Sequence, residues 1–221
     1  MSRAVGADGA RGGWAVAEVE GTPDAARVLR WHLLPAASQV LALPGDAVGV
    51  DMPVGLPERG RRACDLQAKA VLGRAHPRVF LTPPRGVLRA ASYDEAGARH
   101  RELTGGHGLS VQTWHLVPRI REVDEVADDP RLVETHPELS FAALGGAGPL
   151  PSKKTAQGRA ARIDLLERVF GPLTGVPPGD DGLDALACAW SALRWVAGVA
   201  TVLPPGEPPL DARSRPMRIV T

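Results

Sequence analysis

The first third of the chain alternates apolar and polar residues with the period of β-strands. Residues 3–8 (RAVGAD) form a short apolar run that ends on an acid, and residues 14–20 (WAVAEVE) alternate like a half-buried strand. A glycine-rich turn, DGARGG, lies between them, and the turn GTPD precedes a third strand at residues 26–34. The pattern therefore predicts an antiparallel meander of three strands.

After the meander, the pattern changes mostly to the period of helices. Helices are predicted at residues 36–43, 61–73, 92–103, 110–126, 155–170 and 181–197, with one more starting near residue 137. Ser92 is expected to cap its helix, and Pro118 is expected to interrupt the helix that contains it. Further strands are predicted at residues 47–51, 131–135 and 217–220, whereas residues 76–88, 145–155 and 204–209 read as irregular segments.

This order of elements describes an α/β domain with a ribonuclease H-like fold. We expect a mixed sheet, in which parallel strands follow the three-strand antiparallel meander, with helices on both faces. The prediction treats residues 1–221 as one domain and residues 58–129 as a mostly helical insert between the fourth and fifth strands.

Composition narrows the partners that the chain can bind. It is 44% hydrophobic and 23% charged with a net charge of +1, so a broadly basic surface is excluded and any contact with nucleic acid must be local. The two cysteines lie far apart, which argues against a disulfide framework or a structural zinc site. We find no signal-peptide pattern and no run long enough to span a membrane, and we expect a cytoplasmic protein. The oligomeric state stays open, a homodimer included.

The placement of acidic residues carries the chemical signal. Asp8 closes the first strand, Asp51 closes the fourth, and Glu134 lies at the end of the fifth, while Asp181 and Asp184 share one side of the last helix. Strand ends and helix N-termini are where open α/β sheets place their ligand sites. If the first and fourth strands are neighbouring and parallel, their terminal acids lie close together.

Clustered carboxylates repel one another unless a cation lies among them. Mg²⁺ or Mn²⁺ fits, because these ions prefer carboxylate oxygens and retain waters for a substrate phosphate. A pair of such ions would support phosphodiester hydrolysis by a two-metal mechanism.

Each acid also has a structural interpretation. Asp8 precedes a glycine and could form a turn, Asp51 could simply end a strand, and Glu134 could pair with an arginine. Asp180 is better explained as a helix cap, with Asp181 evenly balanced. Asp184 is different, since its helix is apolar nearly all round and a buried carboxylate needs a partner.

Basic residues and one histidine offer further candidates. His136 could act as a general base or orient a phosphate, although a helix-start histidine is an equal alternative. Lys153 and Lys154 are two of only three lysines and suggest a phosphate contact in a glycine-rich loop, against the alternative of a solvated loop. Four arginines could form a basic rim for a polyanion, with ordinary surface charge as the alternative: Arg74, Arg78, Arg85 and Arg89.

Other catalytic patterns are missing from the sequence. There is no GxSxG nucleophile elbow, no histidine near either cysteine, and no P-loop motif. The segment GADGARGG lacks the spacing of a dinucleotide-binding fingerprint and leads into a strand.

Seven stretches of the chain resemble, in order, a family of bacterial and archaeal proteins grouped as domain of unknown function 429 (DUF429). They are VGADGARGGWAVA, VGVDMPVGLPE with RACDLQAKAVLG, YDEA, LSVQTWHLVPRIREVD, VETHPELSFAALGG, SKKTAQGRAARIDLL and DDGLDALACAWSALR. The first family motif usually reads GVDGCPGGW, where this chain has Ala7, Ala10 and Arg11, but the acid is retained.

The resemblance implies a ribonuclease H-like nuclease. The acidic positions of the family fall on Asp8, Asp51, Glu134, Asp181 and Asp184. Its other motif positions fall on Gln112, Glu122, Asp124, His136, Glu138, Lys153 and Lys154, among which Gln112 and the two lysines would contact substrate.

The sequence therefore predicts a hydrolase, a Mg²⁺- or Mn²⁺-dependent nuclease acting on DNA or RNA. Asp8, Asp51 and Asp184 are expected to ligate metal, with Glu134 or Asp181 completing the set and His136 or Lys154 placing water or phosphate. Two alternatives stay open: a catalytically silent module that binds nucleic acid or a protein in the same cleft, and a nucleotide phosphohydrolase of the actin-like type.

Overall fold

A five-stranded mixed sheet forms the centre of the protein in the computed structural model, which describes residues 1–146 and 150–221. The strand order is β3-β2-β1-β4-β5; β1, β2 and β3 are antiparallel, and β4 and β5 run parallel to β1. The strands are β1 (Ser2–Ala10), β2 (Gly13–Gly21), β3 (Ala26–Leu34), β4 (Ala47–Val50) and β5 (Leu132–Glu134). This arrangement is that of a ribonuclease H-like fold, so the prediction of the fold is confirmed.

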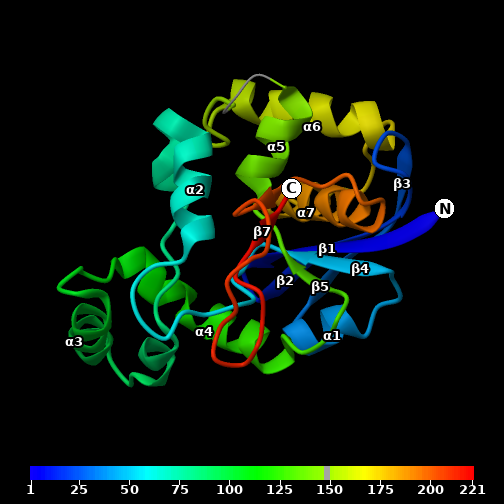
Figure 1. The fold of residues 1–221 in the computed structure, drawn as a ribbon. Helices are drawn as coiled ribbons and strands as arrows, with labels where there is room; N and C mark the ends of the chain where they lie inside the picture. Colours follow the sequence, from blue (N-terminus) through cyan, green and yellow to red (C-terminus); the bar gives the residue numbers. More distant parts are fainter. Residues whose placement is uncertain (147–149) are drawn as a thin grey trace.

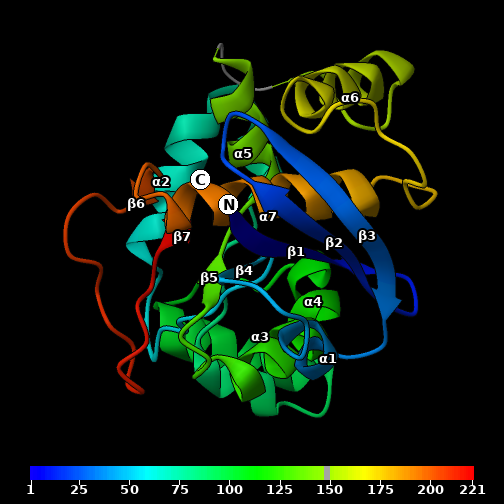
Figure 2. The ribbon, with the colours of Figure 1, turned by 90° about the vertical axis from the view of Figure 1, so that its right-hand side faces the viewer.

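Helices cover both faces of the sheet (Figures 1 and 2). One face carries α1 (Ala37–Leu41) and α4 (Val111–Val126), and the other carries α5 (Pro137–Gly145), α6 (Ala156–Phe170) and α7 (Asp181–Val196). Beyond the sheet, on the side away from the start of β1, lie α2 (Ala63–Leu72), α3 (Tyr93–Thr104) and the short 3₁₀ turns η1 (Gly73–Arg78) and η2 (Arg85–Arg89). We call residues 58–129 the insert.

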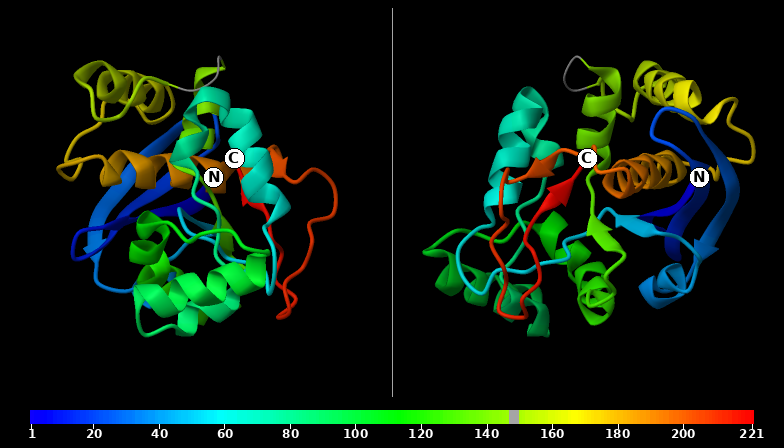
Figure 3. Two further views of the ribbon diagram at one scale, coloured as in Figure 1. Left: turned by 90° about the vertical axis from the view of Figure 1, so that its left-hand side faces the viewer. Right: turned by 45° about the vertical axis from the view of Figure 1, so that its right-hand side comes forward.

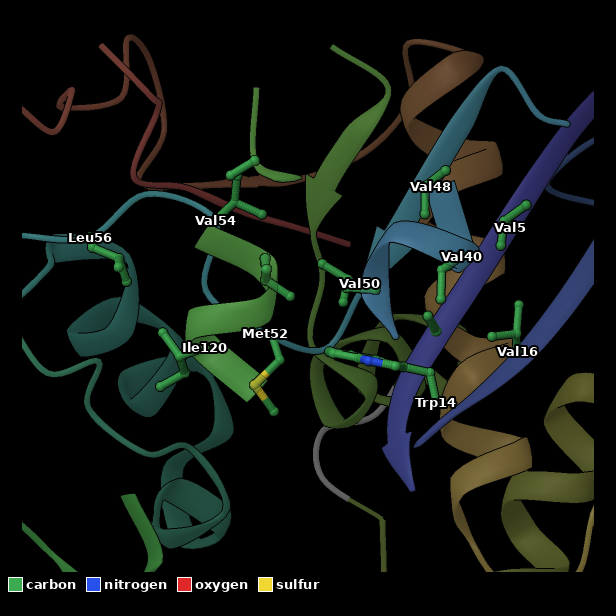
Figure 4. Close-up of a cluster of buried hydrophobic side chains, with 14 of the residues drawn as sticks. Val5, Trp14, Val16, Val40, Val48, Val50, Met52, Val54, Leu56 and Ile120 are labelled. Carbon is green, nitrogen blue, oxygen red and sulfur yellow. The ribbon is translucent and has the colours of Figure 1, made fainter. Parts of the chain in front are cut away.

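Alternation along the strands divides the core into two layers. Val5 and Val16 face α1 and α4 together with Trp14, and Figure 4 shows this cluster. Ala4 and Ala17 face the opposite way, toward the apolar side chains of α5, α6 and α7. The period of two in the sequence therefore becomes two separate apolar layers, one on each side of the sheet.

Helix α7 lies unusually close to the sheet because two strands present glycine to it. A Cβ atom built on Gly6 would lie 2.0 Å from the Ala185 carbonyl oxygen and 2.2 Å from the Ala189 nitrogen. One built on Gly49 would lie 2.5 Å from the carbonyl oxygen of Cys188. Backbone contact at these points fixes the height of α7 above β1 and β4.

The C-terminal segment adds a small second sheet, β6 (Val202–Leu203) paired with β7 (Ile219–Val220). The sequence pattern predicted a strand at residues 217–220, of which the last two form β7, and it missed β6. An isolated parallel bridge from Thr135 to Val220 joins this sheet to the end of β5. The segment therefore returns to the edge of the main sheet.

Pro118 does not interrupt the helix that contains it. The sequence expectation that it would is wrong, since α4 is continuous through it. Pro118 is exposed, so the carbonyl that loses its N–H partner can reach water, while Val117 and Ile120 stay buried. The predicted loop at residues 145–155 includes residues 147–149, which lie outside the described residues.

Candidate active site

Three aspartates from separate elements line one pocket of about 410 Å³, which we call the carboxylate pocket. Asp8 belongs to β1, two residues before its end, and Asp51 directly follows β4, where its N–H donates to the Ala7 carbonyl (3.0 Å). Asp184 lies in the first turn of α7. Because β1 and β4 are parallel neighbours and α7 contacts both, residues far apart in sequence meet at this edge.

Burial and mutual repulsion perturb all three carboxyl groups. Asp8 is 7% exposed and Asp184 is 3% exposed. Burial raises the pKa of Asp8 well above its usual range, and the charges of Asp51 and Asp184 raise it further. Burial also raises the pKa of Asp51 to about 7 and that of Asp184 to about 6, although Lys153 opposes both shifts. The pocket therefore concentrates negative charge that calls for a counter-ion.

Lys153 supplies positive charge at this point. Its ammonium group donates a hydrogen bond to Oδ2 of Asp184 and forms an ion pair with it. Burial lowers the pKa of Lys153, but the charges of Asp184, Asp8 and Asp51 outweigh that effect and raise it above its ordinary value. The sequence had suggested a phosphate contact for Lys153, whereas the structure places it on a carboxylate.

The donor set of this pocket fits a divalent cation in its chemistry. Carboxylate oxygens are the ligands that Mg²⁺ and Mn²⁺ prefer, and a cation would relieve the repulsion that raises these pKa values. Within residues 1–146 and 150–221, however, no three His, Cys, Asp or Glu side chains are grouped closely enough to hold a metal ion without rearrangement. The ion pair of Lys153 with Asp184 is one contact that a metal would have to replace.

His136 and Glu138 form another side of the carboxylate pocket. Burial lowers the pKa of His136, which keeps its imidazole neutral near neutral pH, and its Nδ1 has no hydrogen-bond partner in the described part of the chain. Glu138 is held by Arg162, whose Nη2 donates to both carboxylate oxygens (2.8 and 2.9 Å), and by Nη1 of Arg78 (2.8 Å). Glu138 is therefore already neutralised, while the His136 imidazole can accept a proton.

The rest of the lining includes basic, polar and aromatic side chains beside apolar ones such as Met52 and Leu116. Lys154 and Gln112, both expected to contact substrate, line the carboxylate pocket, as do Arg119 and Phe80. Arg78 lines it too, and its side chain is 29% exposed, so it can meet a ligand while it holds Glu138. Sequence reasoning missed Arg119 and Phe80, because a single arginine in a helix and a phenylalanine in an irregular segment carry no periodic signal.

Glu134 lies outside the carboxylate pocket, which differs from the expectation that it ligates metal. Arg62 donates to both of its carboxylate oxygens (2.7 and 2.6 Å), and the Val54 N–H donates to one of them (2.9 Å). Arg62 also pairs with Asp65, so a buried ionic cluster joins the insert to the end of β5. These partners engage both carboxylate oxygens of Glu134, which pairs with an arginine as the alternative interpretation had it.

The remaining sequence candidates do not line the carboxylate pocket. Asp181 does not line the pocket, although its charge adds to the raised pKa of Asp8, and Asp180 occupies the cap position of α7 without a side-chain cap hydrogen bond. Arg85 is not part of a basic rim, because it is buried in ion pairs with Asp124 and Asp211. Arg74 and Arg89 are exposed. Glu122 is partly exposed, accepts a hydrogen bond from the Trp14 indole (2.9 Å) and pairs with Arg119.

The family model described as "Protein of unknown function (DUF429)" matches residues 6–208 of this chain. The chain belongs to the DUF429 family. The match spans the pocket and both sheet edges, so the resemblance drawn from the seven sequence stretches is confirmed. Among curated proteins, none matches the chain.

Two solved structures are similar to this DUF429 protein. One is *T. thermophilus* RuvC in complex with Holliday junction substrate, at 14% identity and a TM-score of 0.47, covering 90% of this chain and 98% of that chain. The other is a *Thermus thermophilus* RuvC structure, at 14% identity and a TM-score of 0.42, covering 89% of this chain and 97% of that one.

Within the described residues of this DUF429 chain, none of the helices combines the length and the apolar character that crossing a bilayer requires.

Proposed function

We propose that this protein is a divalent-metal-dependent nuclease that hydrolyses phosphodiester bonds of nucleic acid in the carboxylate pocket. The observation that supports this most is the convergence of Asp8, Asp51 and Asp184, from β1, β4 and α7, in one pocket that also has basic lining residues. Acidic groups suit a cation and basic groups suit the phosphate it would act on.

In this proposal Asp8, Asp51 and Asp184 hold Mg²⁺ or Mn²⁺. When bound, such ions activate a water and stabilise the leaving oxygen of a phosphodiester. Lys154 and Arg78 bind non-bridging phosphate oxygens at the rim of the pocket, and Gln112 contacts the adjoining nucleotide. His136, neutral because of its burial, accepts a proton in the pocket.

Glu138 acts through other residues. Glu138 holds Arg78 at the rim of the pocket, and its pair with Arg162 ties α5 to α6. Glu138 therefore positions the phosphate-binding side of the pocket. Lys153 balances the charge of the three carboxylates in the metal-free protein and becomes available to phosphate when a metal takes its place.

Calorimetric titration of Mn²⁺ into the wild type and the Asp8→Asn variant tests the proposal, followed by assays on labelled single-stranded, duplex and branched substrates. Asp8→Asn removes a buried metal ligand and is expected to weaken Mn²⁺ binding and lower cleavage by at least about 100-fold. The exposed Asp164 on α6 provides a matched control, since Asp164→Asn removes the same charge away from the pocket.

Two other results would contradict the proposal. Mn²⁺ binding with no cleavage of any substrate favours the silent binding module. Hydrolysis of ATP that depends on Asp8, without cleavage of nucleic acid, favours a nucleotide phosphohydrolase.

A further inference from the structure

A second pocket, of about 280 Å³, lies within the insert, and we call it the insert pocket. Its walls come from the residues just before α2, from Lys69 in α2 and from residues 77–82, and further from His100 of α3, residues 107–109 and the start of α4. The left view of Figure 3 looks onto this side of the molecule. Phe80 and Gln112 line both pockets, so the two pockets are neighbours.

The insert pocket favours an anionic ligand. Arg61 and Lys69 line it, and no aspartate or glutamate does. Arg61 is exposed and forms no ion pair in the described part of the chain, while Lys69 donates to a single backbone carbonyl, that of His76 (3.0 Å). For a chain with a net charge of +1, an acid-free cationic pocket is a local feature that suits phosphate.

The start of α4 adds to this preference. Ser110 caps the helix and lines the insert pocket, and the first turn of α4 contains no acidic residue. The positive end of a 16-residue helix therefore faces the same space as Arg61 and Lys69.

The insert pocket also offers contacts that suit a nucleobase. His100 is 7% exposed, and its Nδ1 lies 2.8 Å from the His107 carbonyl oxygen. A carbonyl only accepts, so Nδ1 carries the proton and Nε2 is left as an acceptor. Phe80, half-buried where the two pockets meet, offers an aromatic face, and the Gln112 amide both donates and accepts.

We propose that the insert pocket binds one unpaired nucleotide of the same strand whose adjacent phosphate lies at Asp8, Asp51 and Asp184. Phe80 stacks on its base, His100 and Gln112 bind the edge of the base, and Arg61 and Lys69 hold the next phosphate. This proposal rests on the proposed function and deepens it. A base in this pocket must leave its pairing partner, so the preferred substrate has unpaired nucleotides beside the cleaved bond.

Binding measured without metal separates this proposal from the nuclease chemistry. Fluorescence anisotropy in EDTA compares a labelled single-stranded eight-nucleotide probe, as DNA and as RNA, with a duplex of the same sequence. Wild type is expected to prefer the single strand. Phe80→Ala is expected to weaken single-strand binding by about 5- to 150-fold, and Phe80→Trp, which keeps an aromatic face, to restore it.

Charge variants test the phosphate contact. Arg61→Ala is expected to weaken binding and to lower the slope of log affinity against log salt by about 0.7, the value for one phosphate contact on a single strand. Arg168→Ala, an exposed arginine on α6 that lines neither pocket, should change neither quantity. Circular dichroism spectra and melting curves of all variants establish that each one is folded.

Three results would overturn the proposal. The first is that folded Phe80→Ala and Arg61→Ala variants bind the single-stranded probe as tightly as wild type does. The second is that wild type binds the duplex as tightly as the single strand. A mononucleotide could compete as well as the eight-nucleotide probe, which would make this a site for free nucleotides. Loss of Mn²⁺ binding or cleavage in Asp8→Asn, measured separately, reports on the proposed function alone.

Discussion

The ammonium group of Lys153 lies against Asp184 although the Lys153 side chain is 36% exposed. This position makes it an internal counter-ion for three buried carboxylates whose pKa values are raised. Lys153 lies in a loop, outside the sheet and the helix that carry the three aspartates. Its side chain can therefore move without displacing the aspartates.

Replacing Lys153 with methionine tests this role. In EDTA, Lys153→Met is expected to lower the free energy of unfolding by about 1 kcal/mol, a value reduced from that of a fully buried pair because the lysine is partly in water. Mn²⁺ should then raise the melting temperature more than it does in wild type, because no ammonium group has to be displaced.

The adjacent Lys154 provides the control for this experiment. Lys154 is exposed, and Lys154→Met removes the same charge one residue away. Thermal melts of both variants with and without Mn²⁺ make the comparison, and similar behaviour of the two variants would contradict the role of Lys153.

The sequence could identify Asp184 but not the role of Glu134, for a physical reason. A helix that is apolar nearly all round shows at once that Asp184 is buried. Glu134 is the last residue of β5, and its partner Arg62 lies 72 residues earlier in an insert whose path the sequence does not reveal. Local patterns show burial, whereas the partner of a buried charge depends on tertiary structure.

At the scale of elements, the contact between β1 and α7 determines the geometry of the carboxylate pocket. Gly6 in β1 lies against the backbone of α7, and the same two elements carry Asp8 and Asp184. A side chain at Gly6 would therefore separate the two aspartates as well as the two elements.

Gly6→Ala is expected to destabilise the protein by about 3 kcal/mol or more, because the new methyl group would overlap the backbone of Ala185 and Ala189. Urea denaturation measures the loss. Gly97→Ala is the control, since Gly97 lies in α3 and a Cβ atom there has only the flexible end of Arg101 nearby, at 3.6 Å. That variant should be neutral or more stable by up to about 1 kcal/mol, and equal losses in the two variants would argue against close packing at Gly6.

Most elements could be predicted because their patterns are regular. β3 was predicted with its observed bounds, and Ser92 caps α3 by accepting a hydrogen bond from the N–H of Glu95, as its position in the sequence indicated. Pro118 was misread because the rule for proline in helices does not include exposure, which only the packing of α4 decides.

At the scale of the whole molecule, Asp211 connects the C-terminal segment to the insert. Its carboxylate accepts hydrogen bonds from the backbone N–H groups of Leu56, Arg213 and Arg215, and it pairs with Arg85. Burial alone would raise the pKa of Asp211, but the three backbone donors and the Arg85 charge together lower it. One side chain therefore connects three segments that are distant in sequence.

Asp211→Ala is expected to reduce the free energy of unfolding at pH 7 by about 3 kcal/mol, because it leaves Arg85 and three N–H groups without this partner. A carboxyl group whose pKa is lowered on folding stabilises the protein above its unfolded-state pKa of about 3.9 and loses this effect as the pH falls through the folded-state value. The difference from wild type should thus be constant from about pH 5 to 8 and shrink below about pH 4.

Urea denaturation at several pH values measures this difference. Asp128→Ala serves as the control, because Asp128 also pairs with Arg215 but its side chain is 82% exposed, and surface pairs contribute little. A pH-independent loss in Asp211→Ala would show that the charge of the carboxylate is unimportant.

The three aspartates and the insert pocket come from different parts of the chain. β1, β4 and α7 supply the three aspartates, whereas Phe80, Gln112 and Arg61 come from the stretch between β4 and β5. Under the proposed function, directed evolution could therefore randomise Arg61, Lys69 and Gln112 to select new target preferences, while Asp8, Asp51 and Asp184 stay on a scaffold that the library leaves untouched.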